Sequence, residues 1–146
     1  RRLRGNKNMT PKFRAYDGSS LNRMYQPYEV MVGGGNIWII DEDSVAGEWI
    51  VNNDLILMQS TGLRDKNCQE IFEGDIIADA EIIVDVKRHE TLGFYTLIDG
   101  RENFFGNGMS IEKLEQEIKG FSEMTEIVGN IYENISLLEL LEDKEE

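Results

Sequence analysis

The chain has 146 residues, 40% of them hydrophobic, which suits one folded domain or two small subdomains and argues against disorder throughout. Its formal net charge of -13 disfavours binding to phosphate backbones and to anionic membranes. The single cysteine, Cys68, excludes an internal disulfide and a multi-thiolate metal site, and it fits a reducing cytoplasm.

Residues 1–8 differ from the rest of the chain, because they contain four basic residues and no acidic one. Met9 follows them, so we expect residues 1–8 to be a leader or a remnant of upstream sequence. Without them the balance is 11 basic against 28 acidic residues, or -17. The residues after Met9 lack the apolar run of a signal peptide, and no apolar run approaches the ~20 residues that span a bilayer. We therefore expect a cytoplasmic protein that does not contact a membrane.

The first 60 residues predict short strands separated by polar or glycine-rich turns. The strongest turn signals are Asp17-Gly-Ser-Ser20, the Gly33-Gly-Gly-Asn36 hairpin loop and Asn52-Asn-Asp54. The strands that we expect cover residues 12–16, 28–32, 37–40, 48–51 and 55–59.

Residues 57–77 predict a strand, a turn, a short strand, a second turn and a third strand. Gly62 and Gly74 each mark a bulge or a tight turn, because glycine accepts a positive φ without a Cβ penalty. Asp65-Lys-Asn67 predicts a polar turn between them. This stretch specifies folding, and no catalytic arrangement is visible in it.

The second half of the chain predicts more strands and one clear helix. The helix begins after Ser110, a good N-cap, and Gly120 predicts its end. The other expectations are strands at 75–80, 82–88, 93–98 and 126–132, a bulge at Gly129, a loop with aromatic anchors at 103–108, and a last helix at 135–141 capped by Asn134.

Many short strands with few helices suggest a small barrel or a sandwich. We predict a mainly β protein whose core comes from strands within 55–98 and 125–132. The strand at 12–16 and the helix at 110–119 are expected to pack around that core. Residues 9–139 then form one domain, with two small subdomains as the alternative, and residues 140–146 form an acidic tail.

The titratable residues give no catalytic, metal or cofactor site. His89 lies in a charged turn, and Cys68 has no base placed near it by the sequence. The segment from Asp65 resembles a calcium loop only at its start, because Glu70 replaces its glycine and Ile76 its last acid. An enzyme would need a deep pocket that joins several of Glu70, Glu73, Asp75, His89 and Tyr95. A base-stacking platform would use Trp38, Phe94, Tyr95, Phe104 and Phe105, for which packing is the preferred role.

The stretch 57–77 resembles the central signature of the YopX family, small proteins from phages and prophages of low-GC Gram-positive bacteria. The residues in matching places are Gln59, Thr61, Gly62, Leu63, Asp65, Lys66, Asn67, Glu70, Ile71, Glu73, Gly74 and Asp75. Residues 12–17 and 126–133 resemble the family's N-terminal and C-terminal strands. Cys68 stands where glycine is usual, so the left-handed residue of this turn could instead be Asn67. Ser60 replaces a residue that is often aromatic.

The resemblance implies a β-rich fold built on an SH3-type small barrel, and it supplies no activity and no catalytic residue. The motif residues Gln59, Thr61, Gly62, Leu63, Asp65, Asn67, Glu73, Gly74 and Asp75 are therefore expected to be structural. We expect Gly74→Val to cost stability and Asp65→Ala to cost less.

Four functional hypotheses follow. The first is a phage or prophage accessory protein without enzymatic activity or cofactor, which acts in the host bacterial cytoplasm by binding a protein partner or a second copy. The second is an acidic DNA mimic that sequesters a basic host protein. The third is a nucleic-acid-binding small barrel that uses Lys12, Arg14, Arg64 and Lys66, which the acidic charge disfavours. The fourth is an enzyme.

Overall fold

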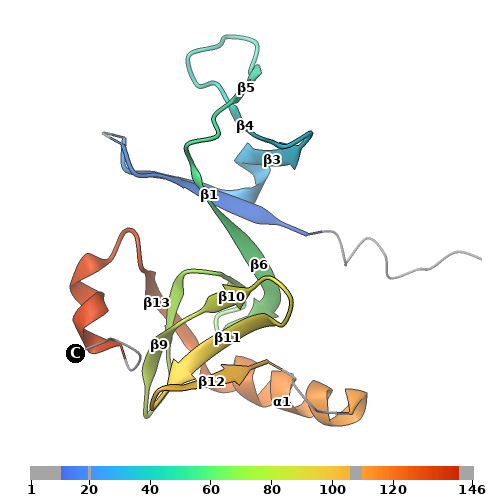
Figure 1. The fold of residues 1–146 in the computed structure, drawn as a ribbon, viewed down its shortest axis with the longest axis vertical. Coiled ribbons are helices and arrows are strands. Elements are labelled where there is room, and N and C mark those ends of the chain that lie inside the picture. Colours follow the sequence, from blue (N-terminus) through green and yellow to red (C-terminus); the bar gives the residue numbers. More distant parts are fainter. Residues whose placement is uncertain (1–10, 20, 106–109, 142–146) are drawn as a thin grey trace, which may run out of the picture. The chain divides into compact units, whose positions relative to one another are not determined.

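The computed structural model describes residues 11–19, 21–105 and 110–141, and it divides the chain into two compact units, Arg1–Ser60 and Thr61–Glu146. Figure 1 shows the course of the chain. The fold is mainly β, as predicted, with thirteen strands in these described ranges. Residues 1–8, predicted to be a leader, and 142–146 of the predicted acidic tail lie outside the described residues.

The first unit consists of two antiparallel sheets. One has the strand order β2-β1-β6, and the other has the order β3-β4-β5. Its elements are β1 (Phe13–Asp17), β2 (Arg23–Tyr25), the 3-10 helix η2 (Pro27–Glu29), β3 (Val30–Gly33), β4 (Asn36–Ile40), β5 (Trp49–Val51) and the first half of β6 (Ile56–Arg64).

The core of the first unit forms where the two sheets bring apolar side chains together. Ala15, Tyr25, Ile39 and Leu55 are buried there. The predicted hairpin at 33–36 is confirmed, since Gly33 pairs with Asn36 across the turn. Strand β2 was not predicted, because three residues that include an arginine carry no period-2 apolar pattern. These three residues form a strand because they pair with β1 in the antiparallel sheet.

The second unit contains the rest of the chain. Strand β6 continues into it and neighbours β7 (Glu70–Phe72). The sheet β13-β8-β9 and the sheet β10-β11-β12 follow. These elements are β8 (Asp75–Ala78), β9 (Ile83–Asp85), β10 (Lys87–His89), β11 (Gly93–Ile98), β12 (Arg101–Phe104), α1 (Ile111–Met124), β13 (Glu126–Asn130) and the 3-10 helix η3 (Ile135–Leu140).

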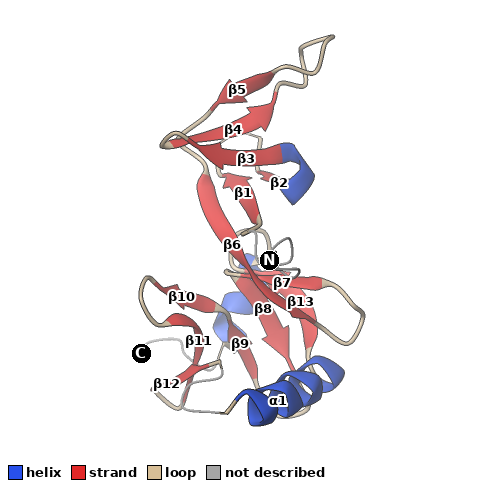
Figure 2. Cartoon of the chain, turned by 90° about the vertical axis from the view of Figure 1, so that its right-hand side faces the viewer, coloured by secondary structure: helices blue, strands red, loops and turns tan. Residues whose placement is uncertain are grey.

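The strands of the second unit form a half-barrel around one apolar cluster, in agreement with the predicted small-barrel core. The cluster is centred on Ile71, Ile77, Val84 and Val86, each at most 4% exposed. Figure 2 shows β8, β9 and β13 in the barrel and α1 beside it. The predicted barrel also included the strand at 12–16 as a packing layer. The structure instead places that strand, β1, in the first unit, where Ala15 joins a separate core.

Helix α1 begins as predicted and ends later than predicted. The side chain of Ser110 accepts a hydrogen bond from the Lys113 backbone N–H (3.2 Å) and caps the helix. The predicted stop at Gly120 is wrong, because the helix continues to Met124. A glycine inside a helix costs about 1 kcal/mol, and the apolar face extends past it to Phe121, which packs on Phe105 with ring centroids 5.4 Å apart.

Asn134 does not cap the last helix with its side chain, contrary to the prediction. Its Oδ1 accepts from the Asn130 backbone N–H (3.0 Å) and so closes the end of β13. The predicted bulge at Gly129 is confirmed by a register shift in the pairing of β13 with β8. A Cβ at Gly129 would lie 2.7 Å from the Asn134 side chain, so glycine is required there.

The predicted loop at 103–108 is partly wrong, because Asn103 and Phe104 belong to strand β12. Residues 106–109 lie outside the described residues. Near the C-terminus, Leu140 is exposed and Leu141 is buried.

Candidate functional site

The central motif is held together by the carboxylate of Asp65, which is 3% exposed. Its Oδ1 accepts from the backbone N–H groups of Asn67 and Gln69, both at 2.9 Å, and closes the turn after β6. Its Oδ2 accepts from the Ile127 N–H at 3.0 Å and so ties the turn to β13. This last bond joins residues 62 positions apart, so no local pattern in the sequence predicts it.

The hydrogen bonds to Asp65 also decide its ionisation. Burial by itself raises the pKa of this carboxyl. The three backbone donors, Ile127, Gln69 and Asn67, together with the charge of Lys66, outweigh burial and lower the pKa below its ordinary value. Asp65 is therefore a structural anion, and nothing in its surroundings suits it to exchange protons near neutral pH.

The two motif glycines both have positive φ. Gly62 has a φ of 81° inside β6, and Gly74 has a φ of 89° in the turn between β7 and β8. The Gly74 N–H donates to the Val86 carbonyl (2.8 Å), and its own carbonyl accepts from the Ile131 N–H (2.9 Å). Asp75 follows, 2% exposed, and its Oδ2 accepts from the Phe72 N–H (2.7 Å).

The remaining motif residues also make contacts within the fold. The Thr61 hydroxyl donates to the Ile71 carbonyl at 2.7 Å and accepts from the Leu63 N–H at 3.0 Å. Gln59 pairs with Phe13 across β6 and β1. Leu63 packs on the barrel core, Asn67 donates to Asp65, Lys66 pairs with Glu126 at 3.4 Å, and Glu73 pairs with Arg88 at 3.2 Å.

Cys68 itself is the left-handed residue of the motif turn, with a φ of 64°. The alternative that Asn67 takes this conformation is wrong, since Asn67 is not among the described residues with positive φ. The thiol side chain is exposed. The left-handed backbone at this position favours glycine, so Cys68 occupies it at a cost in free energy.

Cys68→Gly is expected to stabilise the second unit by about 0.5–1 kcal/mol, because glycine removes the Cβ penalty of a left-handed residue. Urea unfolding followed by far-UV circular dichroism measures the change. Cys68→Ala is the matched control, since it removes the thiol and keeps the Cβ. Equal stability of the two variants would mean that the turn is not strained.

The residues considered for catalysis are not brought together. The Nδ1 atom of His89 accepts from the backbone N–H groups of Thr91 (3.0 Å) and Leu92 (3.1 Å), so the histidine closes a turn. A cleft of the second unit, described below, is lined by none of the five residues that an enzyme was expected to join, which are Glu70, Glu73, Asp75, His89 and Tyr95. Within the described ranges, no group of three or more His, Cys, Asp or Glu side chains is placed to hold a metal ion.

One surface of the first unit is apolar on the side that faces away from its core. Strand pairing places Met31, Trp38 and Val51 in one row across β3, β4 and β5, and Ile40 with Trp49 in the next. Because side chains alternate along a strand, these five share the face opposite to the buried Ile39. We call them the outer face. Met31, Trp49 and Val51 are 47%, 37% and 43% exposed.

Strand β5 is also an edge of its sheet. Its neighbour among the described strands is β4 alone (Figure 2). Every second residue along β5 and its two flanking residues bonds to the neighbouring chain segment through its backbone. The Asn52 N–H donates to the Ile37 carbonyl, the Asp41 N–H donates to the Glu48 carbonyl, and Ile50, opposite Ile39, lies midway between these two bonded positions. The backbone N–H and C=O groups of Trp49 and Val51 therefore point away from β4, toward the open edge.

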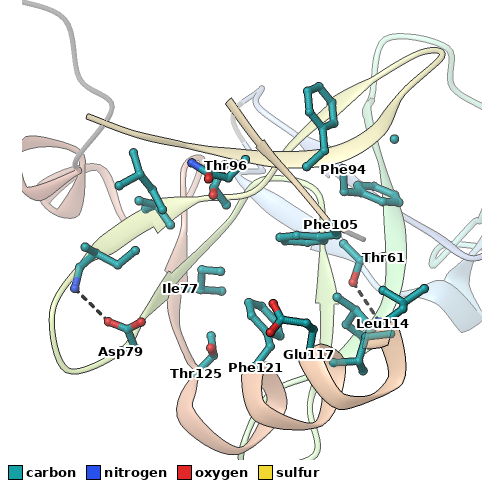
Figure 3. A pocket seen from close by; sticks show the side chains of 18 of the residues that line it. Thr61, Ile77, Asp79, Phe94, Thr96, Phe105, Leu114, Glu117, Phe121 and Thr125 are labelled. Carbon is teal, nitrogen blue, oxygen red and sulfur yellow. Dashed lines mark hydrogen bonds between the residues drawn. The ribbon is translucent and has the colours of Figure 1, made fainter. Parts of the chain in front are cut away.

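The second unit carries an apolar cleft of about 620 Å³ between α1 and the strands of the half-barrel. Figure 3 shows Leu114, Glu117 and Phe121 of α1 facing Phe105 and Ile77. No residue of α1 is buried, although the helix is amphipathic. The other lining residues come from β6, β8, β9, β11, β12 and their loops, and they include Leu63, Ala78, Asp79, Ile82, Val84, Phe94, Thr96, Ile98 and Phe104.

The acidic charge of the chain is unevenly divided. Residues 1–60 hold seven acidic and seven basic residues, and residues 61–146 hold 21 acidic and eight basic ones, so the second unit carries the whole net charge of -13. Three of its aspartates, Asp65, Asp75 and Asp85, are buried. A duplex-like row of phosphate mimics cannot include these three.

The residues considered for a basic face are largely engaged in internal contacts. Arg14 is 8% exposed, with its Nε 3.4 Å from the Met58 sulfur. Arg64 donates to the Cys68 carbonyl (2.9 Å). The aromatic side chains proposed for a stacking platform are divided among different places: Tyr95 packs on Phe104 with ring centroids 4.8 Å apart, Phe94 and Phe105 pack on the barrel core, and Trp38 lies in the first unit.

Together these features define a small-barrel β protein whose signature motif makes structural contacts. A family model described as YopX protein matches residues 12–139, and the chain belongs to the YopX family. Among solved structures it is similar to the crystal structure of protein EF1440 from Enterococcus faecalis, with a TM-score of 0.56 and 25% sequence identity over 88% of this chain and 98% of that one. A search of curated proteins gives no match. In the described part of the chain, no helix is long and apolar enough to cross a membrane.

Proposed function

We propose that this protein is a phage or prophage accessory protein that works in the bacterial cytoplasm, without enzymatic activity, by binding another protein through the outer face of the β3-β4-β5 sheet. The observation that carries the proposal is that face itself. An antiparallel sheet with one face on the core normally turns polar side chains to water on the other. Here the second face carries five large apolar side chains, including both tryptophans of the chain.

The composition of the outer face fits a binding role. Contiguous exposed apolar residues mark interaction surfaces in monomeric proteins, and tryptophan is enriched among the residues that dominate binding energy. Placing Trp49 and Val51 on an edge strand adds backbone donors and acceptors. A partner can therefore add an extended segment to β5 while its own apolar side chains cover the outer face.

The charges beside the outer face indicate the partner's chemistry. The loop between β4 and β5 contains Asp41, Glu42, Asp43 and Glu48. Glu42 pairs with Arg23, and the other three acids have no basic partner among the described ion pairs. An apolar segment with basic flanking residues complements this surface. A second copy of the chain is less suited, because its own outer face brings the same acidic loop and no excess of basic residues to this surface.

The absence of enzymatic activity is part of the proposal. Its support is that the motif carboxylates Asp65 and Asp75 are buried and bonded to backbone N–H groups, that His89 closes a turn, and that the candidate catalytic side chains do not line the cleft. Turnover of a host metabolite by the purified protein, lost on mutation of any of these residues, would contradict it.

A site-specific crosslinking experiment tests the proposal in host cells. A photoreactive phenylalanine analogue replaces Trp49 in one variant and Val128 in another. Val128 is a suitable control because it lies on β13, an edge strand of the second unit, and is 39% exposed. We expect one host or phage protein to crosslink at position 49 and not at 128. Crosslinks between two copies of the chain at 49 would assign the face to a homo-oligomer, and no crosslink at 49 would refute the proposal.

Val51→Lys is expected to weaken binding of the purified crosslinked protein at least tenfold, or about 1.4 kcal/mol, because it puts a charge in the apolar row at the edge strand where the partner is proposed to add its own strand. Val128→Lys makes the same substitution at similar exposure in the second unit and should leave the Kd unchanged. Titration calorimetry measures both. If both variants changed the Kd equally, the change in net charge would explain the effect, and the outer face would not be the binding surface.

A further inference from the structure

We propose that the cleft between α1 and the half-barrel binds a small organic cation with a flat apolar body, such as an aromatic amine. This site goes beyond the proposed protein contact and lies in the other unit of the chain. All residues that line it belong to residues 61–125.

The cleft has the size and the lining of a small-molecule site. Its volume of about 620 Å³ lies within the range of small-molecule sites, and it is walled mainly by apolar side chains. Leu114, Ile118 and Phe121 of α1 face it and are only half-buried. A helix that leaves its apolar face incompletely covered gains stability when an apolar molecule fills the gap, because more of that face then leaves water.

The shape of the lining favours a flat ring. Phe94, Phe105 and Phe121 contribute aromatic surface, and Phe105 and Phe121 meet at a tilt of 53°. Figure 3 shows Phe105 next to Phe121 of α1, and with ring centroids 5.4 Å apart the two rings form one continuous aromatic wall of the cleft. Aromatic side chains favour offset or edge contacts with another ring, and their faces also attract a cation.

The charge of the lining selects the sign of the ligand. Among the lining residues that the structure describes, two are charged, Asp79 and Glu117, and both are acidic and exposed. The Asp79 carboxylate is fixed in place, since its Oδ1 accepts from the backbone N–H groups of Glu81 (2.8 Å) and Ile82 (2.9 Å). The whole unit has a net charge of -13. Fatty acids, nucleotides and other anions are therefore disfavoured, and an ammonium group is favoured.

A matched pair of probes tests both the place and the charge. The amine 1-naphthylmethylamine and the acid 1-naphthoate share one ring system and differ in sign. Methyl NMR spectra of the full chain follow Ile77, Ile82 and Ile118 in the cleft, with Ile37 and Ile39 in the first unit as internal controls. We expect the amine to shift the three cleft methyls with a Kd below about 1 mM, and the acid to bind at least fivefold more weakly.

Charge reversal on α1 is a second test of the preference of the cleft for the amine. Glu117→Lys is expected to abolish the preference for the amine, because it removes one of the two acidic lining groups and adds a positive charge. Glu115→Lys is the matched control, since Glu115 is exposed on the same helix and does not line the cleft. It should keep most of the preference.

Three outcomes overturn the proposal. They are equal binding of the two probes, shifts confined to the first unit or absent from the cleft methyls, and equal effects of Glu117→Lys and Glu115→Lys. The experiment is independent of the proposed protein contact, because Val51→Lys should leave binding of the amine unchanged. Failure of one proposal therefore does not imply failure of the other.

Discussion

Asp65→Ala is expected to destabilise the second unit by about 3–4 kcal/mol. The substitution leaves three partly buried backbone N–H groups, those of Asn67, Gln69 and Ile127, without their acceptor. Each bond to a charged acceptor contributes about 1.5–3 kcal/mol, and an unsatisfied buried donor costs about 1–3 kcal/mol, with partial relief where water enters. The sequence alone suggests a milder effect than that of Gly74→Val. The hydrogen bond from the Ile127 N–H of β13 to Asp65 raises the expected cost of Asp65→Ala, so that it becomes similar to the cost expected for Gly74→Val.

Amide hydrogen exchange is the measurement of choice, because both tryptophans lie in the first unit and their fluorescence does not report on the second. We expect faster exchange in β7, β8 and β13 of the Asp65→Ala variant and unchanged exchange in β4. Asp65→Asn should cost less, since it keeps one oxygen acceptor. A loss below about 1 kcal/mol for Asp65→Ala would show that solvent replaces the carboxylate and that the motif turn is not a structural centre.

The same carboxylate predicts a pH dependence. Its pKa in the folded protein is lower than the ordinary 3.8, so the folded state binds this proton less readily than the unfolded state does. The stabilisation is therefore complete above the ordinary value and is lost as the pH falls through the lower folded value. Comparison of wild type with Asp65→Asn in urea between pH 3 and 6 isolates the effect. The gap in stability between them should narrow at the acid end, and a constant gap would contradict the assignment.

Gly74→Val is expected to cost about 2–4 kcal/mol. Gly74 has a φ of 89°, a conformation that is costly for any residue with a Cβ and most of all for a β-branched one. The chain cannot relax locally, because the bonds of Gly74 to Val86 and Ile131 hold the peptide on both sides. Relaxation would break the contacts of the turn with the β9–β10 corner and with the residue after β13.

Gly62→Val is the matched control for this prediction. Gly62 has a similar φ of 81°, but it is exposed and an added Cβ would meet no atom within 4 Å. Its cost should therefore stay near the backbone penalty of about 1–2 kcal/mol. Thermal unfolding and hydrogen exchange measure both variants. Normal folding of Gly74→Val together with loss of a binding activity would mean that the motif acts in function, against the structural role expected for it.

The local part of the fold could be predicted from the sequence, because local signals are set by neighbours in the chain. The hairpin at Gly33–Asn36, the turn at Asp65–Asn67, the cap at Ser110 and the bulge at Gly129 each depend on residues within a few positions. Strands β2 and β12 were missed because pairing, and no pattern of their own, makes them strands. The helix passed Gly120 because a tertiary contact, Phe121 with Phe105, outweighs a local preference.

The sequence by itself determined the mainly β class, the family motif, the acidic balance and the lack of a contiguous catalytic signature, since composition and short patterns carry these properties. Tertiary structure alone decided which apolar residues remain uncovered. The alternation of side chains along a strand places Trp38 and Ile39 on opposite faces. Only the packing of the first unit shows that Ile39 is covered by its core, and only the pairing of β3, β4 and β5 shows that Trp38, Met31 and Val51 lie together on the outer face. Likewise, only the placement of α1 beside the barrel creates the cleft, because its walls come from segments up to 64 positions apart in the chain.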